Sequence, residues 1–60
     1  SIDLEQCMEK LEDEEREIIA LLPLSSNEEI SEQLEISQNN LRVKVFRARN
    51  KLAECLEIAA

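Results

Sequence analysis

The side chains best suited to chemistry in this 60-residue chain lie on one segment near its C-terminal end. Side-chain amides can form paired hydrogen bonds with adenine, arginine can do so with guanine, and arginine and lysine both neutralise phosphates. Such residues recur after Ser37, on the side of the segment opposite its apolar residues. They are Gln38, Asn39, Arg42, Lys44, Arg47, Arg49 and Lys51. This pattern favours recognition of a polyanion.

A helix over residues 38–58 is predicted from the apolar residues of the same segment, which repeat at spacings of three and four and so share one face. They are Leu41, Val45, Ala48, Leu52 and Leu56. Ser37 is a good N-cap, because its hydroxyl can accept a hydrogen bond from the free backbone N–H of Asn39 or Asn40.

A shorter helix is expected immediately before this one. Ser26 and Glu29 have the spacing of a capping box, which predicts a helix that begins near Asn27 and ends near Leu34. Only residues 35–37 then link the two helices. Helices joined by so short a turn cross steeply, so the pair is expected to form a helix-turn-helix.

The first third of the chain predicts two further helices. Asp3 or Ser1 can cap the first, whose apolar residues run from Leu4 to Leu11. Asp13 is interpreted as the N-cap of the second. The acidic run at residues 12–15 is interpreted as its solvated first turn, which the helix dipole favours. One unbroken helix through residues 3–22 is the alternative.

Pro23 ends the second helix under either interpretation, because a proline pushes the preceding residue out of the α region. The chain has one proline and no glycine, which argues against a sheet with tight hairpin turns. Helices joined by short polar links are expected instead.

The expected fold is all-α: a small four-helix domain that contains a helix-turn-helix with a long C-terminal recognition helix. We expect one domain over residues 1–60, since so short a chain buries only about 60% of its unfolded surface. The start at Ser1, without a methionine, suggests a fragment of a longer protein. The predicted core consists of Leu4, Met8, Leu11, Ile18, Leu22, Ile30, Leu34, Ile36, Leu41, Val45, Ala48 and Leu52.

Charge is distributed unevenly along the chain, whose formal net charge is −7. Residues 1–37 hold twelve acids and two bases, a net charge of −10, whereas residues 38–60 hold five bases and two acids, a net charge of +3. The total has the wrong sign for an ordinary isolated DNA-binding module. The asymmetry could nevertheless orient the chain on a polyanion, or turn its acidic side toward a basic protein.

Catalytic chemistry is not indicated. The chain has no histidine, no serine in a nucleophile elbow and no glycine-rich phosphate loop. We therefore expect no enzyme, no cofactor and no metal site. No apolar run approaches the roughly 20 residues that span a bilayer, so no membrane association is expected.

The two cysteines, Cys7 and Cys55, are 48 positions apart and lack the spacing of a zinc site. A disulfide between them is one interpretation. Two reduced, half-buried thiols in a cytoplasmic protein are the favoured one, because disulfides are rare in that compartment.

The C-terminal half resembles a known family. The segment EEISEQLEISQNNLRVKVFRARNKL is similar to the fourth conserved region of bacterial RNA polymerase sigma factors, in particular the extracytoplasmic-function group. In it, residues 29–31 correspond to the EIA of the family pattern, residues 34–37 to LGIS, residues 41–45 to VKSRL and residues 46–52 to x-RAR-x-x-L. Arg16 and Ile18 also match the upstream part of the pattern. The resemblance covers about residues 4–56.

The resemblance implies a function in transcription. The domain would bind the upstream promoter element in the DNA major groove and dock on the flap of the polymerase β subunit, and an anti-sigma factor is a further partner in this family. The last helix would be the reader, with its N-terminal residues nearest the bases. The implied DNA-binding residues are Gln38, Asn39, Asn40, Arg42, Val43, Lys44, Arg47 and Arg49.

Two positions depart from the family pattern. The turn glycine is replaced by Glu35, which must adopt a left-handed conformation or reshape the turn, and which places a negative charge near the expected DNA. Val43 replaces a small polar residue on the reading face, so that it meets either a thymine methyl group or a protein.

Two other interpretations remain open at this point. The residues LEDEEREII and SNEEI also resemble the effector domain of LuxR-type response regulators, which binds DNA through a similar four-helix plan. Alternatively, the chain is a sigma-like decoy that holds an anti-sigma factor and reads no promoter. The net charge of −7 favours the decoy, and the basic residues of the last helix oppose it.

Overall fold

The computed structural model describes residues 3–59, and the side chains of residues 3–57. Four helices follow one another in the order α1 (Leu4–Met8), α2 (Asp13–Leu21), α3 (Asn27–Leu34) and α4 (Gln38–Ala59). No strand occurs within residues 3–59. The prediction of an all-α, four-helix domain with a long last helix is confirmed.

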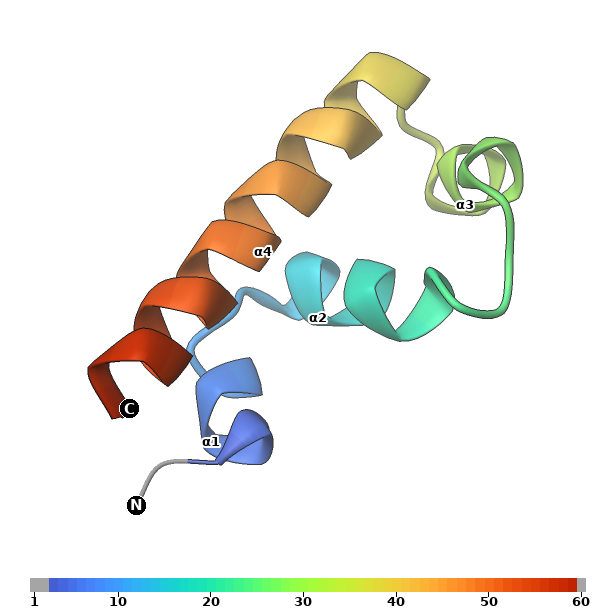
Figure 1. Cartoon of the computed structure of the whole chain (residues 1–60). Helices are drawn as coiled ribbons and strands as arrows, with labels where there is room; N and C mark the ends of the chain where they lie inside the picture. Colours follow the sequence, from blue (N-terminus) through green and yellow to red (C-terminus); the bar gives the residue numbers. More distant parts are fainter. Residues whose placement is uncertain (1–2, 60) are drawn as a thin grey trace.

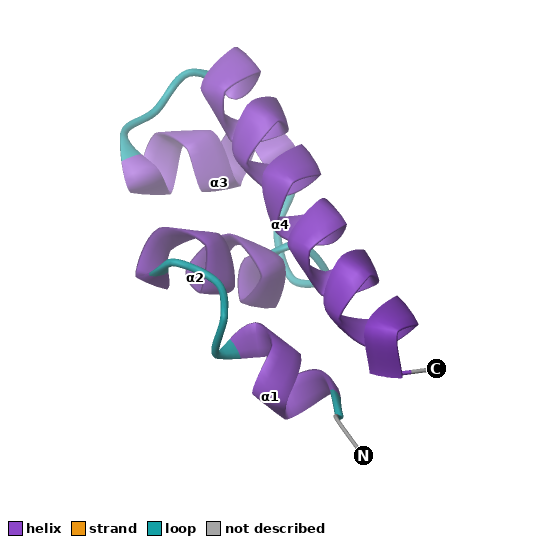
Figure 2. Ribbon diagram, turned by 90° about the vertical axis from the view of Figure 1, so that its left-hand side faces the viewer, coloured by secondary structure: helices purple, strands orange, loops and turns teal. Residues whose placement is uncertain are grey.

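The longest helix, α4, organises the other three. At about 1.5 Å per residue, its 22 residues span roughly 33 Å, most of the 37 Å length of the molecule. Each of α1, α2 and α3 packs against it. Figures 1 and 2 show α3 beside the first turns of α4, α2 beside its middle and α1 beside its last turns.

A steep crossing of α3 and α4 is visible in Figure 1, where α3 is seen nearly end-on and α4 runs across the view. The capping box that starts α3 is present: the Ser26 hydroxyl accepts from the backbone N–H of Glu29, and the Glu29 carboxylate accepts from that of Ser26, each at 3.1 Å. The predicted helix-turn-helix is therefore confirmed, with α3 bounded as expected.

The turn between α3 and α4 contains a residue in a strained conformation. Glu35 has φ 57° and ψ 42°, the left-handed region that favours glycine. Its backbone N–H donates to the carbonyl of Glu32, and that of Ile36 donates to the carbonyl of Ser31. These bonds close the end of α3, as expected if Glu35 takes the place of a turn glycine.

The helix is interrupted at residues 9–12, between α1 and α2, which rules out one unbroken helix over residues 3–22. Asp3 caps α1 as predicted, because its carboxylate accepts from the backbone N–H of Gln6 at 2.9 Å. Ser1, the alternative cap, lies outside the described residues. The predicted cap of α2 is wrong: the N-cap is Glu12, and Asp13 is the first helical residue.

Glu12 takes the capping position because the residue three places on can return the interaction. The carboxylate of Glu15 accepts from the backbone N–H of Glu12 at 2.8 Å, which completes a capping box. The last residue of α2 is Leu21, close to Pro23 as expected, but Pro23 does not push the preceding residue out of the α region. Leu22, which precedes the proline, stays in the right-handed helical region.

The core is a small cluster of aliphatic side chains where α2, α3 and α4 meet. Ile18, Ile30 and Leu41 are at most 1% exposed. Five partly buried residues pack around them: Leu21, Leu22, Leu34, Ile36 and Val45. Most of the predicted core is thus buried or half-buried. Leu4 is an error, because 56% of it is exposed.

The cysteines are the main correction to the sequence-based prediction. Cys7 on α1 and Cys55 on α4 form a disulfide, with their Cα atoms 5.7 Å apart. Both are buried rather than half-buried. No local pattern predicts this pairing, because it depends on the fold bringing the last turns of α4 to α1. None of the described helices is both long and apolar enough to span a bilayer.

Candidate nucleic-acid interface

The first turn of α4 is exposed and well fixed at its end. The hydroxyl of Ser37 accepts a hydrogen bond from the backbone N–H of Asn40 at 3.0 Å, so the predicted N-cap is confirmed. Gln38, Asn39 and Asn40 are all exposed. The remaining free N–H groups of a helix start, together with the helix dipole, favour an anionic group at this end.

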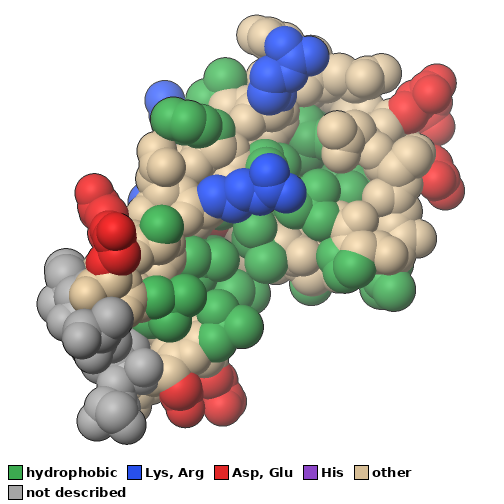
Figure 3. All heavy atoms as spheres, in the orientation of Figure 1, with side chains coloured by type: hydrophobic (Ala, Val, Ile, Leu, Met, Phe, Trp, Pro, Cys, Tyr) green, Lys and Arg blue, Asp and Glu red, His purple; other side chains and the backbone are tan. Residues whose placement is uncertain are grey.

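Three arginines extend the exposed surface along α4. Arg42, Arg47 and Arg49 are exposed, and none forms an ion pair with a described residue. At 100° per residue, Arg42 and Arg49 lie on one edge of the outward face and Arg47 on the other. In Figure 3 basic side chains lie over the first and middle turns of α4, and acidic ones lie toward α3, toward α1 and over the last turns of α4.

The two lysines of α4 have a different environment. Lys44 Nζ lies 3.1 Å from Glu14 Oε1, and Lys51 Nζ lies 2.8 Å from Glu15 Oε1. Lys44 and Lys51 are two helical turns apart and face α2, away from Arg42 and Arg49 and next to the edge that carries Arg47. Two of the five positive charges of α4 are therefore compensated within the fold, and Lys44 is less available to DNA than the predicted site assumed.

The acidic start of α2 is only partly solvated, contrary to the prediction. Glu15 is 5% exposed, because it lies under Lys51. The hydrogen bond from the Lys51 ammonium, together with that from the Glu12 backbone N–H, lowers the pKa of the Glu15 carboxyl. Glu15 thus stays charged under Lys51 at neutral pH and helps to fix how α4 is rotated about its axis.

Apolar side chains interrupt the basic surface. Val43 is 38% exposed and Phe46, the one aromatic residue, is 65% exposed. Both lie between the arginine edges of α4, at 140° and 80° if Gln38 is set to zero and each residue adds about 100°. The outward face of α4 therefore offers amides at its start and a mixed apolar and cationic surface farther along.

Glu35 lies at the edge of this surface. Its side chain is exposed, and it precedes the first residue of α4 by three positions. Its charge therefore lies near the end of the helix at which an anion would approach. From this position, the Glu35 carboxylate would weaken the attraction of an anion to the start of α4.

Comparison with known families decides which helix-turn-helix this is. A family model described as Sigma-70, region 4, matches residues 1–52. The chain belongs to the sigma-70 region 4 family. The matched range includes α1, α2, α3 and the first fifteen residues of α4, which carry every predicted DNA-binding residue. Comparison with curated proteins and with solved structures gave no match.

Membership of the sigma-70 region 4 family gives the protein its class. It is a helix-turn-helix domain of the DNA-binding, transcription-regulating sigma factor type. The alternative assignment to the LuxR-type effector domains is not supported, since the model that matches is that of the sigma factors. The sigma region 4 and LuxR-type domains share the same order of helices, so the sequence pattern alone does not distinguish them.

Sequence reasoning missed the two ion pairs that hold α4 on α2, although their signal was present. Lys44 and Lys51 are seven residues apart, which places them on one helix face next to Ala48. A neighbouring pair of acids, Glu14 and Glu15, stands at the start of the helix that must cover this face. Two bases two turns apart and two consecutive acids are a pattern that predicts such pairing.

Proposed function

We propose that this region 4 domain binds promoter DNA by placing the first turns of α4 in the major groove. The observation that carries the proposal is the exposed, Ser37-capped start of α4, where three amide side chains and Arg42 project beside α3. Amides and arginine are the side chains that distinguish adenine and guanine by paired hydrogen bonds.

The length of α4 limits how much of it can meet the bases. The major groove is about 12 Å wide, whereas α4 is roughly 33 Å long, so only its first few turns can lie within the groove. Residues 38–43 occupy this part. Arg47 and Arg49 lie about 14–17 Å from the helix start, at the distance of the phosphates that border the groove.

The proposed roles follow from this placement. Gln38, Asn39, Asn40 and Arg42 are placed to contact base edges, and Val43 a thymine methyl group. Arg47 and Arg49 are placed to contact phosphates, which position the domain without reading sequence. Lys44 can contact a phosphate only if it gives up its ion pair with Glu14. The α2 surface would then lose one of its two ion pairs with α4.

We further infer that the domain is of the extracytoplasmic-function type and acts in the cytoplasm without catalytic activity of its own. Its protein partners are proposed to be the flap of the RNA polymerase β subunit and an anti-sigma factor. The support is the RAR-x-x-L segment at residues 47–52, which is typical of that group. Shared contacts with polymerase would also explain how a domain with net charge −7 is held on DNA.

A salt titration with duplex DNA tests the proposal. The logarithm of the binding constant should fall linearly with the logarithm of the salt concentration, with a slope of about −0.9 for each phosphate neutralised. If only the three unpaired arginines act, the slope is about −2.7, and if Lys44 and Lys51 also act it approaches −4.5. Binding is best measured by fluorescence anisotropy of a labelled duplex at low salt.

Arg42→Ala tests whether DNA binding depends on α4 itself or only on the total positive charge of the domain. It should weaken DNA binding while leaving the melting temperature unchanged, because Arg42 is exposed and has no partner among the described residues. Arg16→Ala is the matched control: it removes the same charge from α2, where Arg16 pairs with Asp13. Equal weakening by both variants would argue against a reading role for α4.

The decoy function is a second candidate, and one observation favours it. Phe46 is 65% exposed on the outward face of α4, beside Val43. Exposed aromatic side chains flanked by arginine are characteristic of protein interfaces. Under this hypothesis, no DNA binding would be detected even at low salt. Phe46→Ser would then abolish binding to an anti-sigma factor in a pull-down with the purified proteins.

A further inference from the structure

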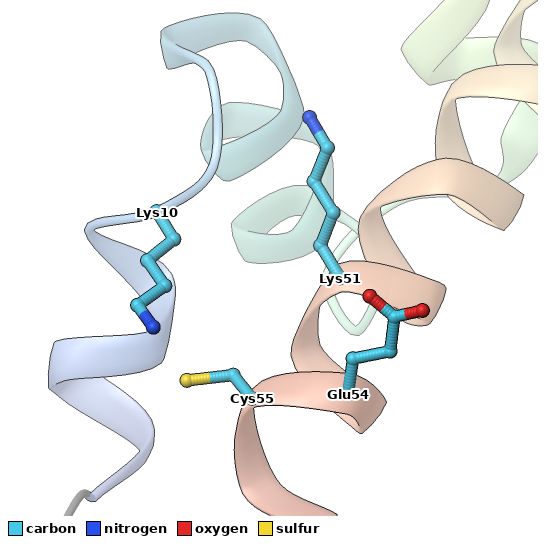
Figure 4. Close-up of a pocket in the computed structure, with 4 residues that line it drawn as sticks. All are labelled: Lys10, Lys51, Glu54 and Cys55. Carbon is cyan, nitrogen blue, oxygen red and sulfur yellow. The ribbon is translucent and has the colours of Figure 1, made fainter. Parts of the chain in front are cut away.

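A small hollow borders the disulfide at the α1 end of the molecule. It has a volume of about 180 Å³ and is lined by Lys10, Lys51, Glu54 and Cys55. A hollow of this size admits only a small molecule, such as cysteine. Drug-sized ligands need larger cavities. Figure 4 shows the four side chains around the hollow.

The two sulfurs of the disulfide differ in their position relative to this hollow. Cys55, which is 4% exposed, is one of its lining residues, whereas Cys7, at 1% exposed, is not. A molecule in the hollow would therefore meet the Cys55 sulfur first. Since a thiolate must reach a disulfide sulfur to attack it, the hollow determines which of the two is attacked.

Opposite charges stand on two sides of the hollow. Lys10 follows α1, and in Figure 4 its ammonium is directed toward the Cys55 side chain. Glu54 comes from α4, and in the same view its carboxylate lies on the other side of Cys55 from Lys10 and points away from the sulfur. Neither forms an ion pair with a described residue, whereas Lys51 is turned away toward Glu15, to which it is bonded. One ammonium and one carboxylate are thus available to a ligand.

This arrangement matches the charges of an amino-acid thiol. Cysteine, and the γ-glutamyl end of glutathione, carry a carboxylate and an ammonium group on one carbon atom. The carboxylate can pair with Lys10 and the ammonium with Glu54, which holds the thiol within the hollow beside Cys55. A thiol whose only charge is that of its attacking thiolate would make neither of these two pairs.

We propose that the hollow is a thiol-exchange site, at which a zwitterionic amino-acid thiol opens the Cys7–Cys55 disulfide by attack on Cys55. The incoming thiolate forms a bond to Cys55 Sγ, and the electron pair of the broken S–S bond leaves on Cys7 as a thiolate. A second thiol molecule then attacks the mixed disulfide and releases Cys55 as a thiolate. Two thiols are oxidised to one disulfide, and the cystine of the protein is reduced.

Opening the disulfide would release α1 from α4. Helix α1 has five residues, and Cys7 is the one among them that is buried. Leu4, Glu5 and Gln6 are exposed, and Met8 is half-buried. The disulfide is therefore the main attachment of α1. The aliphatic cluster of Ile18, Ile30 and Leu41 lies among the other three helices and would remain intact.

The cellular meaning of this site rests on the proposed function. A domain that acts with RNA polymerase works in a compartment rich in small thiols, where disulfides are usually transient or redox-sensing. The disulfide would then report the redox state through the position of α1. The chemistry of the site does not depend on DNA binding, and the following experiment uses no DNA.

The experiment compares four thiols on the oxidised protein: cysteine, the anionic 3-mercaptopropionate, the cationic cysteamine and the neutral 2-mercaptoethanol. Disulfide opening is followed by mass spectrometry after acid quenching. Lys10→Gln should lower the rate at which cysteine and 3-mercaptopropionate open the disulfide roughly two- to fivefold, the range expected of an exposed ion pair. Glu54→Gln should lower the rate of disulfide opening by cysteine and by cysteamine by a similar factor. 2-Mercaptoethanol also attacks as a thiolate but has neither a carboxylate nor an ammonium group, so each variant should slow it less than it slows cysteine.

Peptide mapping of the quenched mixture identifies the attacked sulfur. The proposal requires the mixed disulfide with cysteine on Cys55. A mixed disulfide on Cys7, or equal slowing of all four thiols by Lys10→Gln, would overturn it. Since both variants retain the disulfide and change exposed side chains, they are expected to fold like the parent protein, which circular dichroism checks.

Hydrogen exchange of the oxidised and reduced proteins tests the release of α1. After reduction, the amides of residues 4–9 should exchange at least tenfold faster, whereas those around Ile30 and Leu41 should keep their protection. Unchanged protection of α1 would contradict its attachment through the disulfide. Loss of protection throughout the chain would contradict the independence of the aliphatic cluster.

Discussion

The first turns of α4 are held by buried aliphatic side chains, whereas its last turns are held by a disulfide. At one end Ile18, Ile30 and Leu41 exclude water almost completely. At the other, Cys7 and Cys55 supply a covalent bond, and Leu4 and Leu56 remain 56% and 39% exposed. The two ends therefore respond to different conditions, although they belong to one helix.

This difference separates the proposed DNA-reading surface from the proposed thiol-exchange site. Burial of apolar surface does not change with redox state and depends little on acid, whereas the disulfide requires an oxidising environment. Between the two ends, the ion pairs of α4 with Glu14 and Glu15 add a contribution that depends on pH. Each region can thus be perturbed separately.

The largest expected effect is at the aliphatic end. Leu41→Ala should lower the free energy of unfolding by roughly 2–5 kcal/mol, because it leaves a cavity among fully buried neighbours. For so small a domain this is a large part of the total. Thermal melting by circular dichroism, in oxidised protein, measures it.

Leu4→Ala is the matched control, with the same change of side chain at a position that is 56% exposed. Its effect should stay within about 0.5 kcal/mol. If the two variants melted at the same temperature, the distinction between the aliphatic cluster and the α1 end would be lost.

An intermediate effect is expected at the ion pairs. Glu15→Gln should cost roughly 1–2 kcal/mol at neutral pH, a discounted value because 41% of the Lys51 side chain is exposed. The pKa of Glu15 is lowered in the folded state by Lys51 and by the Glu12 backbone N–H, so its contribution is present above the ordinary carboxyl pKa and is lost as pH falls through the lowered value.

Melting curves between pH 7 and pH 3 test this sign. The difference between parent and Glu15→Gln should shrink on acidification, while both proteins keep some acid sensitivity from Glu29, whose pKa is lowered by its bonds to Ser26. Glu17→Gln, at an exposed position on the same helix, serves for comparison. A difference that grew toward low pH would exclude a stabilising pair between Glu15 and Lys51.

The smallest effect concerns the turn before α4. Glu35→Gly should raise the free energy of unfolding by roughly 0.5–1 kcal/mol, because glycine adopts the left-handed conformation without the steric cost of a side chain. It should also strengthen DNA binding slightly, since a negative charge next to the reading surface is removed. Chemical denaturation and the DNA titration measure the two effects.

Glu35→Gln separates these two contributions. It removes the charge and keeps the side chain, so that DNA binding should improve without the gain in stability. If Glu35→Gly destabilised the domain, the left-handed conformation of Glu35 would not be a source of strain.

The helices could be predicted from the sequence because their signals are local. Ser26 and Glu29 mark the start of α3, and Ser37 that of α4, through side-chain bonds to a backbone N–H three residues away. The start of α2 was misplaced by one residue. Asp13 is the better intrinsic cap, but only Glu12 has a partner, Glu15, at the distance that a capping box requires.

The contacts between distant residues were predicted less well. Cys7 and Cys55 were interpreted as reduced thiols because neither spacing nor neighbouring residues indicate a disulfide across 48 positions. Lys44 was included among the DNA-binding residues because its position in the helix matched, whereas its pairing with Glu14 depends on how α2 lies on α4. The DNA-binding residues themselves remain a prediction.

The disulfide also makes most of this chain a covalent ring. Cys7 and Cys55 enclose all of α2 and α3 and most of α4, and only short ends lie outside. A protease that cuts the exposed link at residues 23–24 would open the ring without releasing a fragment, and the two pieces would stay joined until the disulfide is reduced. The oxidised domain should therefore tolerate a single break in its backbone that would separate the reduced domain into two peptides.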